Sequence, residues 1–429
     1  MLEKLFKLSE HGTTMRTEVI AGITTFLTMA YIIFVNPAIL ADTGMDHGAV
    51  FVATCLAAAV GCFIMGFVAN YPIALAPGMG LNAFFTYTVV LGMGYTWQVA
   101  LAAVFASGVL FILLSLFKIR EWIINSIPMS LRTGISSGIG LFLAFIALKN
   151  AGIIVDNPAT LVSLGHITSL HCVLGALGFF LTIALVYRNV KGGVMIAILA
   201  ISAIGLMIGD VHWTGLVSMP PSIAPTFLQL DFSALLDVGM ISVVFAFLFV
   251  DLFDTAGTLV GVAQKAELIG EDGKIPRLNR ALLADSSATV AGALLGTSNT
   301  TSYIESAAGV ATGGRTGLTA VVVGILFLFA LFFAPLAGMI PAYATAGALL
   351  YVSILMLSGL VGIDWRDLTE AAPVVVTCLM MPLTSSIAEG ISLGFISYAV
   401  IKLLSGKARH VSLSVWVMAA IFVVKYIAG

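Results

Sequence analysis

Residues 245–261 read FAFLFVDLFDTAGTLVG, an apolar run interrupted by two aspartates. Asp251 and Asp254 are three positions apart, so they share one face of a helix, and Thr258 continues that face. An ionisable side chain inside a bilayer is costly and is by default a functional candidate. The stretch therefore predicts a membrane span that carries part of a binding site.

The composition of the whole chain agrees with a membrane protein. Of 429 residues, 60% are hydrophobic and 9% are charged, whereas soluble domains carry about 25% charged residues. This excludes a soluble enzyme, a disordered chain and a coiled coil, and no basic face is present for nucleic acid. The 4 cysteines lie in apolar stretches without a CxxC spacing, so buried thiols are favoured over a disulfide or a metal site.

Apolar runs predict an all-α polytopic protein with fourteen membrane segments. Seven runs precede a polar stretch at 210–237 and seven follow it, and a last piece at 412–427 leaves the C-terminal topology open. The runs lie near 19–40, 49–69, 73–90, 97–117, 132–149, 170–187, 193–209, 239–262, 281–297, 300–312, 317–337, 343–361, 371–387 and 389–404.

The distribution of Lys and Arg predicts the orientation. With the N-terminus inside, 17 of the 19 basic residues fall on the inner side, and only Lys149 and Lys425 do not. Since basic residues favour the cytoplasmic side, we expect a cytoplasmic N-terminus in a multi-pass inner-membrane protein.

Matching features recur at an offset of about half the chain. Asn36 and Asp254 are 218 residues apart, and Gly108 and Gly324 are 216 apart. A unit of seven spans is odd-numbered, so the second copy must be inverted in the membrane. Inverted repeats are a transporter architecture, with the substrate site near the midplane.

Two segments are too polar for a plain lipid-facing helix. IALAPGMGLNAFF (73–85) contains Pro77 and two glycines, and GTSNTTSYIESAAGV (296–310) contains six consecutive Ser, Thr or Asn residues before Glu305. Interrupted helices survive at membrane depth only where protein buries them or where they line a cavity. Small residues for helix packing explain such a run poorly, so we expect half-helices that meet at the substrate site.

The candidate site combines carboxylates with amide, hydroxyl and aromatic groups. Carboxylates accept N–H donors and aromatic faces stack on flat rings, which favours a planar, nitrogen-rich heterocycle. The alternative is that an acid only caps or pairs within the bundle. The expected substrate-binding residues are Asp254, Glu305, Asn82, Thr258, Thr300, Thr301, Ser302, Phe84 and Phe253.

We expect a proton gradient to supply the energy, with no cofactor and no metal. Histidine is absent from the middle of the core spans, so the expected proton carriers are the carboxylates Asp251, Asp254 and Glu305. No Walker motif and no metal-ligand cluster is visible in the sequence.

At these segments the chain resembles the nucleobase:cation symporter-2 superfamily, in its AzgA-like purine-permease branch. The strings that carry the resemblance are TTFLTMAYIIFVNPAIL, LAPGMGLNAFF, FVDLFDTAGTLVGV, ALLADS and GTSNTTSYIESAAGVATGGRTGLTA. The resemblance implies a seven-plus-seven inverted repeat, with a short strand and a half-helix in segments three and ten. It also implies a core domain (1–117 and 238–337) that moves against a gate domain (118–237 and 338–429).

The resemblance further implies proton-coupled uptake of a purine base, such as adenine, guanine or hypoxanthine, by a lipid-embedded carrier and not by an enzyme. The acids that contact the base fall on Asp254 and Glu305, and a histidine of the uracil branch is Thr258 in this sequence. A homodimer through the gate domains would be in keeping with the family.

Two alternatives have different requirements. An anion transporter of the related sulfate-permease fold usually adds a cytoplasmic domain, for which the 25 residues after 404 are too few, and paired acids repel anions. A membrane-embedded enzyme or receptor needs a cytosolic domain or a catalytic set, and the sequence has neither.

Overall fold

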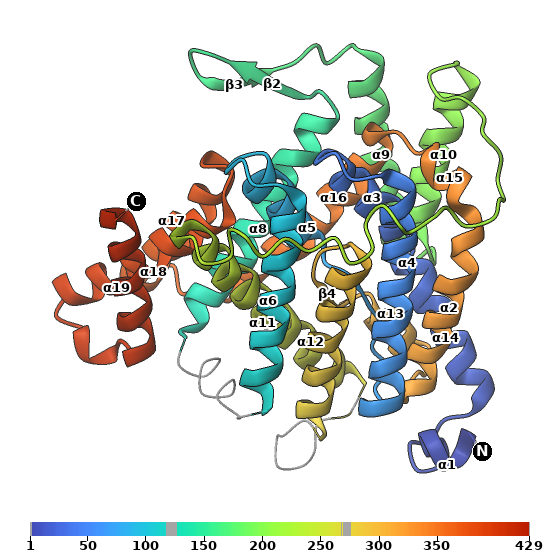
Figure 1. Ribbon diagram of the computed structural model, residues 1–429, viewed down its shortest axis with the longest axis horizontal. Coiled ribbons are helices and arrows are strands. Elements are labelled where there is room, and N and C mark those ends of the chain that lie inside the picture. The colour runs from blue at the N-terminus through green and yellow to red at the C-terminus, as the bar shows by residue number, and fades with distance from the viewer. Residues whose placement is uncertain (1, 117–126, 267, 269–275, 429) are drawn as a thin grey trace.

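The computed structural model describes residues 2–116, 127–266, 268 and 276–428 and, except at a few positions such as Phe253, their side chains. Most of this described chain is helical (Figure 1). Within it, eight helical stretches are long and apolar enough to cross a membrane, and further apolar helices of 10–17 residues accompany them. The protein is a helical polytopic membrane protein.

One set of helices, the α4 group, packs around α4. Helix α4 contacts α3, α12 and α14, while α6 contacts α11 and α12, and α13 contacts α2. The group comprises α2 (Met15–Met29), α3 (Ile32–Ala41), α4 (His47–Ile64), α5 (Met79–Ala83), α6 (Trp97–Leu116), α11 (Val238–Lys265), α12 (Leu278–Leu295), α13 (Ser306–Ala311) and α14 (Gly317–Ala330).

A second set, the α8 group, packs around α8. Helix α8 contacts α16, α17 and α18, and α9 contacts α10 and α16. The group comprises α8 (Met129–Asn150), α9 (Leu170–Tyr187), α10 (Gly193–Met207), α16 (Ala342–Leu357), α17 (Leu368–Leu383) and α18 (Ile387–Leu404). Both groups draw on both halves of the chain, as the predicted core and gate domains do; the predicted boundary at 117–118 lies outside the described residues.

The two groups meet along a narrower seam. Helix α11 touches α8 and α18, α5 touches α8, α10 touches α2, and α16 touches α3. At this seam Gly80 of α5 lies so close to α8 that a Cβ on it would be 2.5 Å from Ile139 Cγ2. Close approach of backbone to side chain is therefore built into the seam.

The two interrupted segments each contain a strand. Strands β1 (Leu75–Pro77) and β4 (Thr300–Ser302) pair antiparallel, with Leu75 opposite Ser302, and all six residues are buried. Strand β1 leads into α5 and then into the π-helical stretch η2 (Phe84–Val90), and β4 leads into α13. Each strand thus satisfies the backbone groups of the other inside the membrane protein.

Two features were not predicted from the sequence. The first span is broken at Ala30 and Tyr31, between α2 and α3. Within α3, Pro37 has no N–H to donate to the preceding turn. Strands β2 (Ile154–Asn157) and β3 (Leu161–Leu164) form an exposed hairpin after α8, at the opposite end of the molecule from α1 (Leu2–Phe6) (Figure 1).

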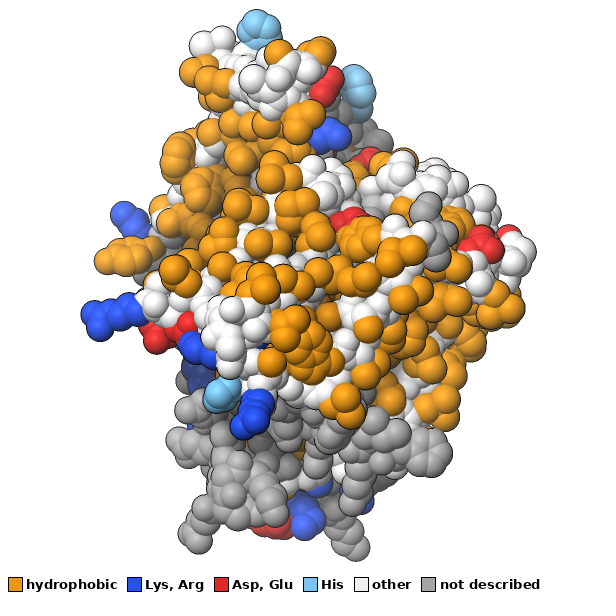
Figure 2. All heavy atoms as spheres, turned by 90° about the vertical axis from the view of Figure 1, so that its left-hand side faces the viewer, with side chains coloured by type: hydrophobic (Ala, Val, Ile, Leu, Met, Phe, Trp, Pro, Cys, Tyr) orange, Lys and Arg blue, Asp and Glu red, His pale blue; other side chains and the backbone are white. Residues whose placement is uncertain are grey.

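The face that carries α17, α18 and α19 (Leu413–Ala428) is covered largely by hydrophobic side chains (Figure 2). Among them, Leu413, Val424 and Ile427 are more than half exposed. A contiguous apolar surface of this extent suits a lipid environment.

A buried carboxylate connects α2, the first helix of the α4 group, to α14, the last. Glu18 of α2 is fully buried and accepts hydrogen bonds from the backbone N–H groups of Arg315, Thr316 and Thr319. These N–H groups belong to the start of α14 or the turn before it, so the carboxylate satisfies donors that the helix itself leaves free.

Candidate functional site

The paired strands form the centre of the site. Beyond the ladder, Tyr303 N–H donates to the Ala74 carbonyl and Gly78 N–H donates to the Asn299 carbonyl, each at 2.9 Å. The Tyr303 hydroxyl also donates to the Pro77 carbonyl at 2.6 Å. These bonds fix the two interrupted segments to each other.

A cavity of about 490 Å³ lies beside the strands, between the α4 group and the α8 group. Its volume is within the range of about 300–1,000 Å³ that is typical of small-molecule sites. The α4 group and the strand segments beside it contribute Gly78, Met79, Gly80, Leu81, Val250, Asp254, Thr258, Thr301, Ser302, Tyr303, Ile304 and Glu305. The α8 group contributes Met129, Arg132, Thr133, Ser136, Ile139, Val352, Leu355 and Met356, and Gly359 follows α16 in η4 (Ser358–Gly362).

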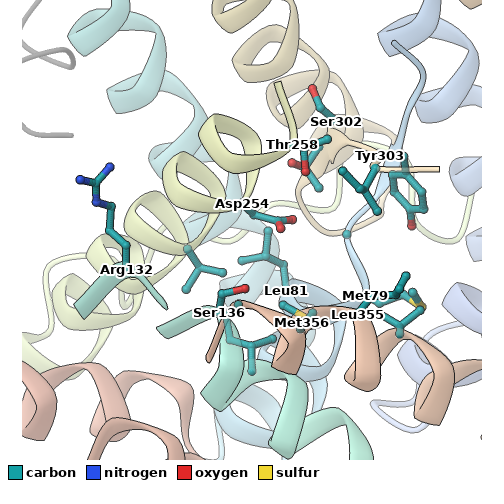
Figure 3. A pocket seen from close by; sticks show the side chains of 18 of the residues that line it. Met79, Leu81, Arg132, Ser136, Asp254, Thr258, Ser302, Tyr303, Leu355 and Met356 are labelled. Atoms are coloured by element: carbon teal, nitrogen blue, oxygen red, sulfur yellow. The ribbon is translucent and has the colours of Figure 1, made fainter. Parts of the chain in front are cut away.

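Two carboxylates line this cavity. Asp254 projects from the middle of α11 (Figure 3), and Glu305 lies between β4 and α13. One oxygen of Glu305, Oε1, accepts a hydrogen bond of 2.6 Å from the Tyr31 hydroxyl. Within the described part of the chain, Asp254 accepts no comparable hydrogen bond, so its carboxyl is available to a ligand or a proton.

Asp251 faces the other way. It is 1% exposed, and its Oδ2 accepts hydrogen bonds of 3.0 Å from Thr289 of α12 and from the Asn299 side chain. Asp251 is not part of the cavity wall. It binds the segment before β4 to α11 and α12 from behind the site.

A third aspartate, Asp285 of α12, holds β4 in place and has no predicted role. Its Oδ1 accepts both the backbone N–H and the hydroxyl of Ser302, each at 2.9 Å, and its Oδ2 accepts the Thr255 hydroxyl at 2.7 Å. Thr255 also bonds to Thr301 at 2.8 Å. The cost of burying an acid, which marked Asp254 and Glu305, is the signal that could have identified Asp285.

The structure brings five of the predicted substrate-binding residues to the cavity wall: Asp254, Thr258, Thr301, Ser302 and Glu305. Figure 3 shows Asp254 and Thr258 on α11, facing Ser302 and Tyr303 of the strand segment.

Three predicted residues lie outside the wall, and a fourth side chain, Phe253, lies outside those described. Asn82 is fully buried and accepts a hydrogen bond from Ser298. Thr300 is buried with its backbone carbonyl bonded to Thr289. Phe84 packs edge-on against Phe247 at 4.9 Å between ring centroids.

The opposite wall is mostly aliphatic, and Arg132, Thr133 and Ser136 add polar groups to it. Ile139, Val352, Leu355 and Met356 face the strands, while Arg132 lies at the edge of the cavity with its guanidinium turned away from Asp254 (Figure 3). The buried Nε of Arg132 has no hydrogen-bond partner among the described residues. The site thus sets two carboxylates on one wall against a wall that is mostly aliphatic but also carries hydroxyl groups.

This arrangement suits the binding of a flat, uncharged ring with N–H groups. The carboxylates supply acceptors, and the Tyr303 ring and the aliphatic wall supply apolar contact. The part of the chain that the structure describes contains no group of three or more His, Cys, Asp or Glu residues able to hold a metal ion.

Comparison with known proteins places the chain in a family. Residues 16–393 match a family model described as "Permease family". Adenine permease AdeP of Escherichia coli is 54% identical over 100% of this chain and 96% of its own length. Guanine/hypoxanthine permease PbuG of Bacillus subtilis is 48% identical over 99% of each chain.

The fold also has relatives of low sequence identity. The solved structure of SLC26A9 superposes with a TM-score of 0.66 at 10% identity, over 91% of this chain and 65% of that chain. At this identity the likeness concerns the fold alone. On the family model and the identity to the two permeases, the chain belongs to this permease family, in its purine-permease branch, and is a transporter rather than an enzyme.

Proposed function

We propose that this protein takes up purine nucleobases across the inner membrane by proton symport. The observation that carries the proposal is a cavity lined by two carboxylates, Asp254 and Glu305, beside the paired strands. Relatives named as adenine and as guanine/hypoxanthine permeases support a purine as the substrate.

In this proposal the base lies flat between the strands and the α8 group. Asp254 and Glu305 accept ring or exocyclic N–H groups, and the hydroxyls of Thr301 and Ser302 lie beside them in the wall. Since each hydroxyl both donates and accepts, these groups serve a 6-amino and a 6-oxo purine alike.

We further propose alternating access by movement of the α4 group, as core, past the α8 group, as gate. The sparse seam between the groups supports such movement, as does the position of the cavity on it. Fourteen segments in a seven-plus-seven inverted repeat, with a cytoplasmic N-terminus, complete this model.

The cavity extends toward the end of the molecule that is predicted to be cytoplasmic. On α11 its wall runs from Val250 to Thr258, and on α8 it runs back from Ile139 to Met129. These directions lead to the end of α11 and the start of α8, the two helix ends predicted to be cytoplasmic, so an inward-facing state is part of the proposal.

Proton coupling needs a carboxylate that exchanges its proton during the cycle, and no cofactor beyond the proton gradient. Asp251, Asp254 and Glu305 remain the proposed carriers. A homodimer through the α8 group is the proposed assembly in the lipid bilayer.

Radiolabelled adenine and guanine uptake into cells that lack their own purine permeases tests the proposal. We expect Asp254→Asn and Glu305→Gln each to lower uptake at least ten-fold, whereas Asp156→Asn on the exposed hairpin leaves it unchanged. Normal uptake by the double variant would refute the site, and uptake that persists after an ionophore collapses the proton gradient would refute the coupling.

An anion as substrate is the competing reading, since the fold is shared with SLC26A9. Two carboxylates in the cavity disfavour it, because like charges repel at short range. Inhibition of adenine uptake by excess sulfate or bicarbonate, but not by unlabelled guanine or hypoxanthine, would favour the anion reading.

A further inference from the structure

The break in the first span places a tyrosine against one of the two cavity carboxylates. Tyr31 lies between α2 and α3 and is fully buried. Its hydroxyl donates a hydrogen bond of 2.6 Å to Glu305 Oε1, a residue 274 positions away. A hydrogen bond to an ionised acceptor is among the stronger and more directional kinds.

Other contacts hold the same two segments together. The Thr28 hydroxyl, one turn before Tyr31, lies 3.5 Å from the Glu305 carbonyl oxygen. Further along, Gly309 of α13 is so close to α2 that a Cβ on it would be 2.6 Å from the Ala21 carbonyl oxygen. Tyr31 and Glu305 therefore belong to one packed unit and keep their contact when the α4 group moves as a body.

Tyr31 does not reach the ligand space. It is absent from the cavity wall, whereas Glu305 is part of it. A carboxylate has two oxygens, and the hydroxyl occupies Oε1 from the protein side. This leaves the second oxygen as the acceptor for an N–H group in the cavity.

We propose that Tyr31 is a positioning residue, which orients the Glu305 carboxylate so that its second oxygen accepts an N–H group of the bound base. The role rests on the proposed purine transport. Since a glutamate side chain has several rotatable bonds, fixing one oxygen reduces the orientational freedom that binding would otherwise have to remove. Asp254 has no comparable donor among the residues that the structure describes, so in this proposal the ligand itself orients its carboxyl group.

Tyr31→Phe tests this role, because it removes the hydroxyl and keeps the ring. We expect the KM for adenine to rise roughly ten-fold, as for loss of a hydrogen bond to a charged group, with the maximal rate within two-fold of wild type. The matched control is Tyr87→Phe, since Tyr87 also donates to a carboxylate, Asp42, at 2.8 Å but lies outside the cavity wall. The control should leave the KM unchanged.

If Tyr31 only stabilised the fold, the effect of Tyr31→Phe on the KM would not depend on where the carboxylate at position 305 lies. In Glu305→Asp the carboxylate is withdrawn by one methylene from Tyr31, so adding Tyr31→Phe should change the KM less than two-fold. If the two substitutions instead multiply in their effect on the KM, they act independently and the proposal is overturned.

A second variant covers the case in which Tyr31→Phe does not fold. A fluorinated tyrosine at position 31 keeps the hydroxyl and makes it a stronger donor, so the KM should change while the melting temperature in detergent stays within a few degrees. An unchanged KM overturns the role of Tyr31. Absence of adenine and guanine uptake in the wild type would instead overturn the proposed function.

Discussion

One carboxylate oxygen of Asp285 accepts two hydrogen bonds from Ser302, one from its backbone N–H and one from its hydroxyl, each at 2.9 Å. Asp285→Ala would leave these donors and the Thr255 hydroxyl without their acceptor in a buried place. Since an unpaired buried polar group costs about 1–3 kcal/mol, we expect unfolding to become easier by roughly 3 kcal/mol or more. Thermal melting in detergent and adenine uptake should both report the loss.

The neighbouring residue provides the control for Asp285. Ser286 is equally buried, but its hydroxyl donates only to carbonyls of its own helix, 2.9 Å from that of Leu282. Ser286→Ala should therefore cost less than about 1 kcal/mol. Equal melting temperatures for the two variants would argue against a special role for Asp285.

The contact between Gly80 and Ile139 predicts a steric block at the seam. In Gly80→Ala the new methyl would lie 2.5 Å from Ile139 Cγ2, closer than real carbon atoms approach. We expect adenine uptake to fall at least ten-fold, and Ile139→Ala in the same chain to restore part of it by removing that methyl. Gly338→Ala, where no atom lies within 4 Å, should transport normally.

The outcome for the double variant decides the cause. If Gly80→Ala remains inactive with Ile139→Ala, while each protein stays folded in detergent, the methyl acts on the base or on α5 rather than on the seam.

An ion pair with a buried lysine and a partly exposed glutamate joins three helices of the α8 group. The Lys402 ammonium, 4% exposed in its side chain, pairs with Glu370, which also accepts from Ser130 and Tyr398. If Glu370 is lost, Lys402 keeps a hydrogen bond to Thr369 and a contact with the Tyr398 ring but no carboxylate. Glu370→Ala therefore leaves a buried charge unpaired and should destabilise the protein by about 3–5 kcal/mol. Lys402→Met should cost less because Glu370 retains two hydroxyl donors.

The more exposed pair Lys407–Asp367, 2.9 Å apart, is the comparison for that ion pair. Lys407→Ala should change the unfolding free energy by about 1 kcal/mol or less. A loss as large as that of Glu370→Ala would show that burial is not the cause. Chemical unfolding in detergent measures all three variants.

Because of Asp367, we expect the stability of the protein to fall at acidic pH. Hydrogen bonds from Thr369, followed by Lys407, hold the pKa of this carboxyl well below its usual range. The folded state therefore gains stability above the usual aspartate pKa of about 3.9, and this gain is lost as the pH falls toward the lower folded value. The difference in melting temperature between wild type and Asp367→Ala should be constant above pH ~5 and shrink below pH ~4.

The order of the segments and the two interruptions could be read from the sequence, because hydropathy and intramembrane polarity depend only on local residue types. The predicted runs at 73–90 and 300–312 contain β1 with α5 and β4 with α13. The break at Tyr31 could not be read, since its aromatic side chain lies in an apolar run and its partner is 274 residues away.

The sequence also did not predict which side chains of α5 and η2 point into the cavity. Asn82 and Phe84 follow Leu81 within one turn, but only Leu81 lines the cavity, because each step along a helix turns by about 100°. Proximity in sequence to Asp254 or Glu305 therefore does not identify a cavity residue. The rotation of α5, set by contacts such as the one between Gly80 and Ile139, decides it.

The pairing of β1 with β4 has a consequence for biosynthesis. The Tyr303 hydroxyl and the Pro77 carbonyl that it binds are 226 residues apart. At about 5–20 residues per second, synthesis of the chain between them takes roughly 10–45 s. During that interval β1 sits in the bilayer with unpaired backbone groups, at a cost of several kcal/mol each in hydrocarbon. Insertion machinery or neighbouring helices must therefore keep the backbone groups of β1 out of contact with lipid until β4 has been synthesised. A chain truncated before residue 300 should accordingly be degraded rather than accumulate in the membrane.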